Sequence, residues 1–150
     1  YHRKGYSENW INQRLKSIEV RKELTDEWER RGIKRGQEFA TLTDIITQGW
    51  SGMTTRQYKR YKGLKTESLR DNMTELVLNM LAEATTTEIS KERRPRTFAA
   101  NRIVAAQGGR IAGNTRREIE AQTGKKIVSR LNAEQVLAAK EIEQNEEEKE

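Results

Sequence analysis

Residues 75–89, ELVLNMLAEATTTEI, form the most apolar segment of the chain and decide its fold class. Large apolar side chains recur here at the three- and four-residue intervals of one helical face, which predicts a central core helix. We expect the run of three threonines at 85–87 to weaken the end of this helix, because β-branched side chains lose rotamer freedom in a helix. The predicted stripe consists of Leu76, Val77, Met80 and Leu81, with Leu78 beside it.

The same helical period continues upstream of this segment. It predicts one helix over about 8–31, with a break near Thr25 and a stop at Gly32, and an amphipathic helix between Gly36 and Gly49. The tryptophans and Phe39 are interpreted as core anchors. These are Trp10, Trp28 and Trp50.

Between these helices and the core helix lies a strongly basic stretch, MTTRQYKRYKGLKTESLRDNM, at residues 53–73. Thr54 can cap a short helix that ends at Gly63, and a second helix can begin near Thr66. Two short helices around a glycine turn resemble a helix-turn-helix. We therefore predict a helix-turn-helix-like unit over 54–73.

Downstream of the core helix, the only proline, Pro95, lies in the polar stretch SKERRPR. We expect a boundary there, between Glu88 and Thr97. A helix after Pro95 should stop at Gly108 and Gly109, where we expect close backbone packing, and a second, arginine-rich helix should follow. The spacing of these glycines does not fit a phosphate-binding loop.

Overall, the pattern predicts an all-α fold, a small bundle of about five to seven helices with a looser helical C-terminal extension. We predict a compact helical domain over 1–90, a basic and partly helical extension over 91–131, and an acidic tail, helical or disordered, over 132–150. A low hydrophobic share, 33% against 35% charged residues, favours slender helices with long solvated faces.

Composition argues against several classes of function. Cysteine is absent and the single histidine is His2, so thiolate chemistry and histidine-based catalysis or metal binding have no candidate residues inside the fold. We therefore expect no enzyme activity, no cofactor and no metal site, although a weaker alternative is a nuclease that uses Asp44, Asp71 or Glu83 with a divalent ion. No apolar run approaches the length of a membrane span, and no signal peptide is visible, so we expect a cytoplasmic protein.

The net charge of +6 is unevenly distributed. Residues 56–70 contain six basic side chains against Glu67 alone, and residues 91–130 contain eleven against three glutamates. The sign reverses after residue 133, where glutamate dominates. The chain thus has a basic body and an acidic end.

The basic stretch supplies the candidate binding site for nucleic acid or another polyanion. Ammonium and guanidinium groups bind phosphates, and a tyrosine can stack or donate a hydrogen bond. The alternative is a solvated helical face whose tyrosines pack on the core. The candidate residues are Arg56, Tyr58, Lys59, Arg60, Lys62, Lys65 and Arg70.

The strings YKRYKGLK and LRDNMT, within a match that runs from about residue 1 to 132, resemble one known group of bacterial and prophage proteins. This group comprises the DNA-damage-inducible protein D and the prophage antirepressors of the BRO family, in the region that follows their Bro-N domain. The positions that carry the resemblance are Tyr58, Lys62, Gly63, Leu64, Lys65, Leu69, Arg70 and Asp71.

The resemblance implies a DNA-binding Bro-N module upstream of Tyr1, a role in the SOS response to DNA damage or in prophage induction, and no catalysis. We thus expect a non-enzymatic region that contacts DNA, or a DNA-repair or repressor protein, through a basic surface. The alternative is an oligomerisation or spacer module with pairing between subunits. Its candidate contacts are Ile11, Leu15, Ile18, Leu24 and Leu137.

Overall fold

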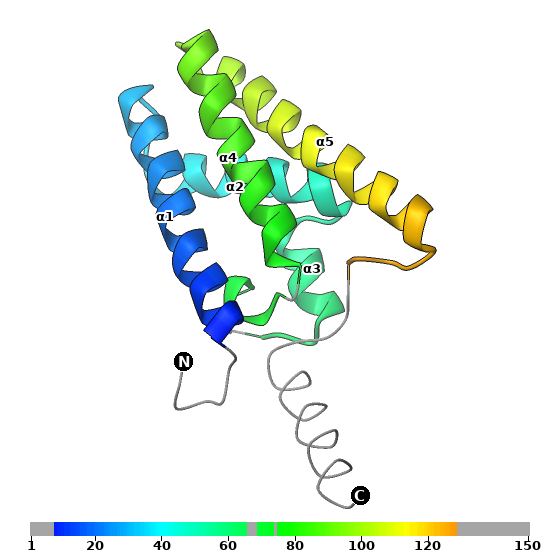
Figure 1. The fold of residues 1–150 in the computed structure, drawn as a ribbon. Helices are drawn as coiled ribbons and strands as arrows, with labels where there is room; N and C mark the ends of the chain where they lie inside the picture. The colour runs from blue at the N-terminus through cyan, green and yellow to red at the C-terminus, as the bar shows by residue number, and fades with distance from the viewer. Residues whose placement is uncertain (1–7, 66–68, 74, 129–150) are drawn as a thin grey trace, which may run out of the picture.

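Helices make up the fold in the part of the chain that the computed structural model describes, residues 8–65, 69–73 and 75–128. This part contains five α-helices, one 3-10 turn and no strand (Figure 1), so the predicted all-α bundle is confirmed. The elements are α1 (Glu8–Arg30), α2 (Gln37–Ser51), α3 (Thr55–Tyr61), η2 (Arg70–Asn72), α4 (Leu76–Arg93) and α5 (Phe98–Thr123).

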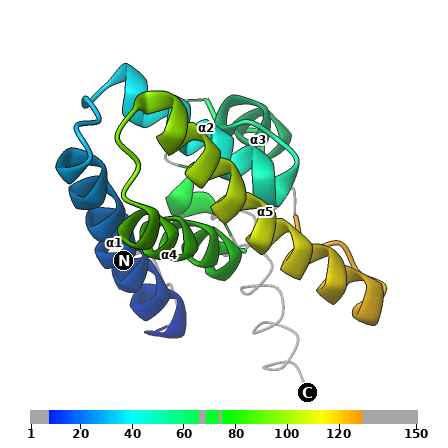
Figure 2. The same ribbon diagram turned by 90° about the horizontal axis from the view of Figure 1, so that it is seen from above.

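Helix α4 lies at the centre of the bundle. It packs against α1 on one side and α5 on the other, while α5 also runs across α2 (Figures 1 and 2). The short helix α3 follows α2 and packs on its end. Among the described residues, no helix combines the length and the apolar character that crossing a membrane requires.

The central helix buries a more polar face than its apolar pattern predicts. Leu76 and Leu78 are buried, but Val77 is 56% exposed. The threonine run does not end the helix, because the hydroxyls of Thr86 and Thr87 donate hydrogen bonds to backbone oxygens one turn earlier, at 2.8 and 3.0 Å. Helix α4 continues to Arg93, and the predicted weakening at 85–87 stays a prediction.

Helices α2 and α5 approach each other through glycine. A Cβ atom on Gly49 would lie 2.8 Å from the Cα of Gly109, and one on Gly113 would lie 2.3 Å from the oxygen of Gly49. No side chain larger than hydrogen fits these positions without a shift of the backbone. The predicted close backbone packing is confirmed, but the predicted helix stop at Gly108 and Gly109 is wrong, because α5 runs through both residues.

The C-terminal extension was expected to be looser than the rest, and this expectation is wrong for α5. Its residues Val104, Ala105 and Ala112 are buried in the bundle. The sequence contains few large apolar groups here because close contact with α2 requires small ones. The predicted acidic tail, 132–150, lies outside the described residues.

The core anchors are placed largely as predicted. Trp28 and Trp50 are almost fully buried, and the ring of Phe39 lies 5.2 Å from that of Trp28 in a tilted arrangement. The side chain of Trp10 lies outside the described part. Helix α1 continues through Thr25, so the predicted break is wrong, and the chain turns at Gly32 with a φ of +79°.

Candidate polyanion interface

The basic helix α3 begins with the predicted cap. The Thr54 hydroxyl accepts a hydrogen bond from the backbone N–H of Gln57 at 3.2 Å, and the Gln57 side chain accepts one from the N–H of Thr54 at 2.9 Å. This reciprocal capping box satisfies two donors that the helix itself leaves unpaired. The N–H of Thr55 donates to the carboxylate of Asp44 on α2 at 3.2 Å, which ties the start of α3 to its neighbour.

Two of the predicted binding residues lie on the inner side of this segment, where they are buried. Tyr58 is completely buried, and its ring lies 5.9 Å from that of Trp50. Lys62 is only 2% exposed, and its ammonium lies 3.2 Å from the carboxylate of buried Glu75. Burial lowers the pKa of Lys62 to about 8. The prediction that these two side chains reach a polyanion is wrong, because both serve the core.

The prediction that Arg70 reaches a polyanion is also wrong, because its guanidinium is held inside an ionic network. It donates hydrogen bonds to Glu83 at 2.5 Å and to Ser17 at 3.2 Å. Arg21 donates to the same carboxylate of Glu83 at 3.0 Å, and Asn79 donates to its other oxygen at 3.1 Å. This network joins α1, η2 and α4, so Arg70 has a structural role.

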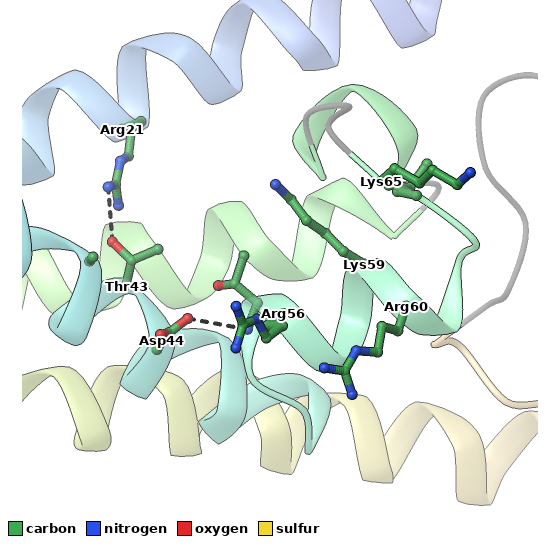
Figure 3. Close-up of a pocket in the computed structure, with 10 residues that line it drawn as sticks. Arg21, Thr43, Asp44, Arg56, Lys59, Arg60 and Lys65 are labelled. Carbon is green, nitrogen blue, oxygen red and sulfur yellow. Dashed lines mark hydrogen bonds between the residues drawn. The ribbon is translucent and has the colours of Figure 1, made fainter.

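Burial, the largest effect, lowers the pKa of the second arginine in this network, Arg21, while Glu83 opposes that shift. The guanidinium also donates to the Thr43 hydroxyl at 2.9 Å (Figure 3). Arg21 is therefore fixed between α1, α2 and α4, with about a quarter of its side chain exposed.

The remaining predicted cations gather around one hollow. Arg56, Lys59, Arg60 and Lys65 line a space of about 640 Å³ between α1, α2 and α3, together with Arg21 (Figure 3). Arg56, Arg60 and Lys65 are exposed, and Lys59 is half-buried. The other lining residues are Ala40, Thr43, Asp44, Thr55 and Leu64. We call this space the basic hollow.

The charge of the basic hollow is unbalanced. Asp44 is the single carboxylate among the lining residues, against five cationic side chains, of which Arg21 is already paired with Glu83. Within the described residues, the side chains of Arg56, Lys59 and Arg60 have neither an ion pair nor a hydrogen bond. Cations without an internal partner are available to phosphates or carboxylates from outside the molecule.

The geometry of the segment does not fit the predicted helix-turn-helix. After α3 the chain turns at Gly63, with a φ of +73°. Of the residues described beyond it, 69–73 contain only the single 3-10 turn η2, and Leu69 and Met73 are buried. A recognition helix must present several side chains to a groove, which a three-residue turn cannot do. The described residues therefore do not support the predicted helix-turn-helix.

The alternative nuclease is not favoured by the carboxylates. Glu83 is saturated by its arginine and asparagine partners, and Asp44 accepts the N–H of Thr55. The side chain of Asp71 lies outside the described part. In the residues that the structure describes, no three acidic or histidine side chains are gathered in a way that could hold a metal ion.

Sequence reasoning missed the contributions of α1 and α2 to this site. Arg21, Thr43 and Asp44 are distant from the basic stretch in sequence, and only the packing of the helices brings them to the hollow. No local motif marks them. Comparisons of the chain with protein-family models, with curated proteins and with solved structures find no match.

Proposed function

We propose that this chain is a non-enzymatic binding region whose basic hollow contacts the phosphate backbone of DNA. The observation that supports it is the set of three cations on α3, Arg56, Lys59 and Arg60, that have no ion pair or hydrogen bond within the described residues, whereas Lys62 and Arg70 are paired with glutamates. Phosphate contact of this kind positions a protein on nucleic acid without reading its sequence.

The resemblance stated above supplies the biological setting of this proposal. An upstream DNA-binding module would select the site, and the basic hollow would add sequence-independent contacts or hold a partner during the SOS response or prophage induction. Binding would be stoichiometric, and the structural bonds of Glu83 and Asp44, two of the three carboxylates that the alternative nuclease would use, favour this.

Salt dependence tests the proposal directly. Each phosphate contact on duplex DNA releases about 0.9 of a counterion, so three to four contacts give a slope of about −3 to −4 in log affinity against log salt. Affinity should then fall about 40- to 150-fold between roughly 50 and 200 mM salt. Fluorescence anisotropy with a short labelled duplex of arbitrary sequence measures both quantities.

Two triple variants with the same change in net charge make the test specific. Replacing Arg56, Lys59 and Arg60 with Ala should reduce the slope by about 3 and weaken binding at low salt. The control replaces Lys34, Arg102 and Arg110, which are exposed and outside the hollow. The control should change the slope by less than about 1. Equal effects of both variants would refute a localised site, and circular dichroism checks that each remains helical.

An oligomerisation module is the second candidate, and two exposed residues of α1 favour it. Leu15 and Ile18 are 51% and 47% exposed, whereas Ile11 and Leu24 are buried in the bundle. The latter two therefore cannot pair between subunits, and Leu137 lies outside the described residues. If α1 pairs, light scattering should give a dimer that becomes a monomer when Leu15 and Ile18 are replaced with Ser.

A further inference from the structure

The described chain ends beside helix α3, and other residues of this helix line the basic hollow. Helix α5 ends at Thr123, and the left-handed Gly124 turns the chain back. The backbone N–H of Ile127 then donates to Glu120 at 3.1 Å, which fixes this return. Residues 124–126 and Val128 line a second hollow together with Met53 and Tyr61. The chain therefore leaves the described part beside the C-terminal end of α3.

The sequence that follows has the opposite charge to the basic hollow. Residues 134–150 contain seven glutamates and two lysines. The hollow is lined by five cationic side chains and one carboxylate, and three of the cations, Arg56, Lys59 and Arg60, have no ion pair within the described residues. Carboxylates and phosphates are both anionic oxygen groups that pair with arginine and lysine, so one site accepts either.

From these three observations we infer that the glutamate-rich segment 134–150 binds in the basic hollow of its own chain and competes there with nucleic acid. The competition rests on the proposed function, whereas the intramolecular contact does not.

The length of the connecting chain is compatible with this contact. Glu134, the first glutamate of this segment, lies six residues after Val128, and an extended chain of six residues spans about 20 Å. Helix α3, with its seven residues, is about 10 Å long. The connecting chain is thus longer than α3, so the glutamates that follow it can extend past the end of this helix toward the cations of the hollow.

The tether makes a weak contact effective. A short linker holds the acidic segment near the hollow at an effective concentration on the order of millimolar. Exposed ion pairs are individually weak and are screened by salt, so a nucleic acid with a dense row of phosphates can still displace the segment. The basic hollow would then bind only ligands with higher charge density than its own tail.

Carbodiimide cross-linking of the full chain tests the contact without any nucleic acid. This reagent joins a lysine amine to a carboxylate with no spacer, and mass spectrometry identifies the joined residues. At low salt, the glutamates of 134–150 should couple to Lys59 at least several-fold more than to Lys34 or Lys91, which are exposed elsewhere. Equal coupling to all three lysines would overturn the inference.

Charge neutralisation in the full chain tests the competition. Glu143, Glu146, Glu147 and Glu148 are changed to Gln, which should raise duplex affinity about tenfold near 50 mM salt because displacement of the tail is no longer required. A matched control changes the same number of glutamates outside the tail. The control residues are the exposed Glu23, Glu88, Glu92 and Glu118.

The outcomes separate the two ideas. The control should raise affinity less than about threefold, through net charge alone. Equal gains in both variants would overturn the competition. If no variant binds duplex DNA at all, the proposed function fails, and the cross-linking result alone decides whether the segment occupies the hollow.

Discussion

The ammonium of Lys62 lies 3.2 Å from the carboxylate of Glu75, and both side chains are shielded almost completely from water. Lys62 follows α3, and Glu75 precedes α4. The pair therefore joins the basic helix to the central helix of the bundle. A buried ion pair gains little net stability, but removing one partner leaves an uncompensated charge in the core.

This pair predicts an unusual response to alkaline pH. Burial lowers the pKa of Lys62 from 10.5 to about 8, so between these values the unfolded chain binds more protons than the folded one. The contribution of Lys62 to the free energy of unfolding should then rise with pH across this window, by up to about 3 kcal/mol.

Urea unfolding from pH 7 to 10 measures this rise as the difference between the wild type and Lys62→Met. The variant is less stable at every pH, because Glu75 loses its partner. A difference that stays flat, or that shrinks as pH rises, would contradict the lowered pKa. Lys34→Met, an exposed control, should show no pH-dependent difference.

Glu27 predicts sensitivity to acid. Burial alone would raise its pKa, but hydrogen bonds from Arg31, Arg30 and Ser90 together bring the pKa below 4.5. The stability that ionised Glu27 contributes is complete above about pH 4.5 and is lost as the pH falls through its lower folded value.

Chemical denaturation between pH 2 and 6 compares the wild type with Glu27→Gln. The gap between their free energies of unfolding should close as the solution becomes more acidic. Glu29→Gln is the control, because Glu29 lies on the same helix and pairs with Arg35 at the surface. A gap of constant size would mean that packing, and not charge, makes Glu27 important.

The close packing at Gly109 predicts that even a methyl side chain lowers the stability of the fold. A Cβ atom there would lie 2.7 Å from the backbone oxygen of Ile46. In an open helix, Gly→Ala stabilises by about 0.5–1 kcal/mol. Here we expect Gly109→Ala to destabilise by about 1–3 kcal/mol, because α2 and α5 must separate. Thermal unfolding checks the sign, with exposed Ala106→Leu as a near-neutral control. A stabilised Gly109→Ala would show that the contact is looser than described.

The cap of α3 connects stability to binding. Thr54→Ala removes the acceptor for the Gln57 N–H and should lower stability by about 1 kcal/mol. A frayed first turn displaces Arg56, so duplex affinity at low salt should fall a few-fold. Thr115→Ala is the comparison, since Thr115 lies inside α5 and bonds only to the preceding turn. Unchanged binding by Thr54→Ala would argue that Arg56 is dispensable.

Local signals were sufficient where the neighbouring chain alone decides the structure. Thr54 and Gln57 stand three positions apart in a pattern that forms a capping box in any setting, and Gly32 ends α1 because it adopts a positive φ without strain. Helix type and the locally capped helix ends were therefore predictable from the chain itself, whereas the stop predicted at Gly108 and Gly109 was not found.

The choice of buried face was not predictable in the same way. Hydrophobic spacing placed Val77 in the core, yet α4 turns Asn79 and Glu83 inward, because Arg21 and Arg70 from α1 and η2 pair with Glu83, and Glu83 accepts a hydrogen bond from Asn79. Partners supplied by distant segments also explain why the candidate site was only partly predictable. Six of its seven predicted residues are basic, and their sequence contains no sign of which ones have a carboxylate nearby.

By itself, the sequence determined an all-α chain with a basic middle and an acidic end, since helical period, caps and charge are properties of adjacent residues. Only the tertiary structure decided that Lys62 is buried and Arg70 is held by Glu83 while Arg56, Lys59 and Arg60 face a hollow. The physical reason is that the free energy of a charged group depends on the burial and the partners that distant segments bring to it.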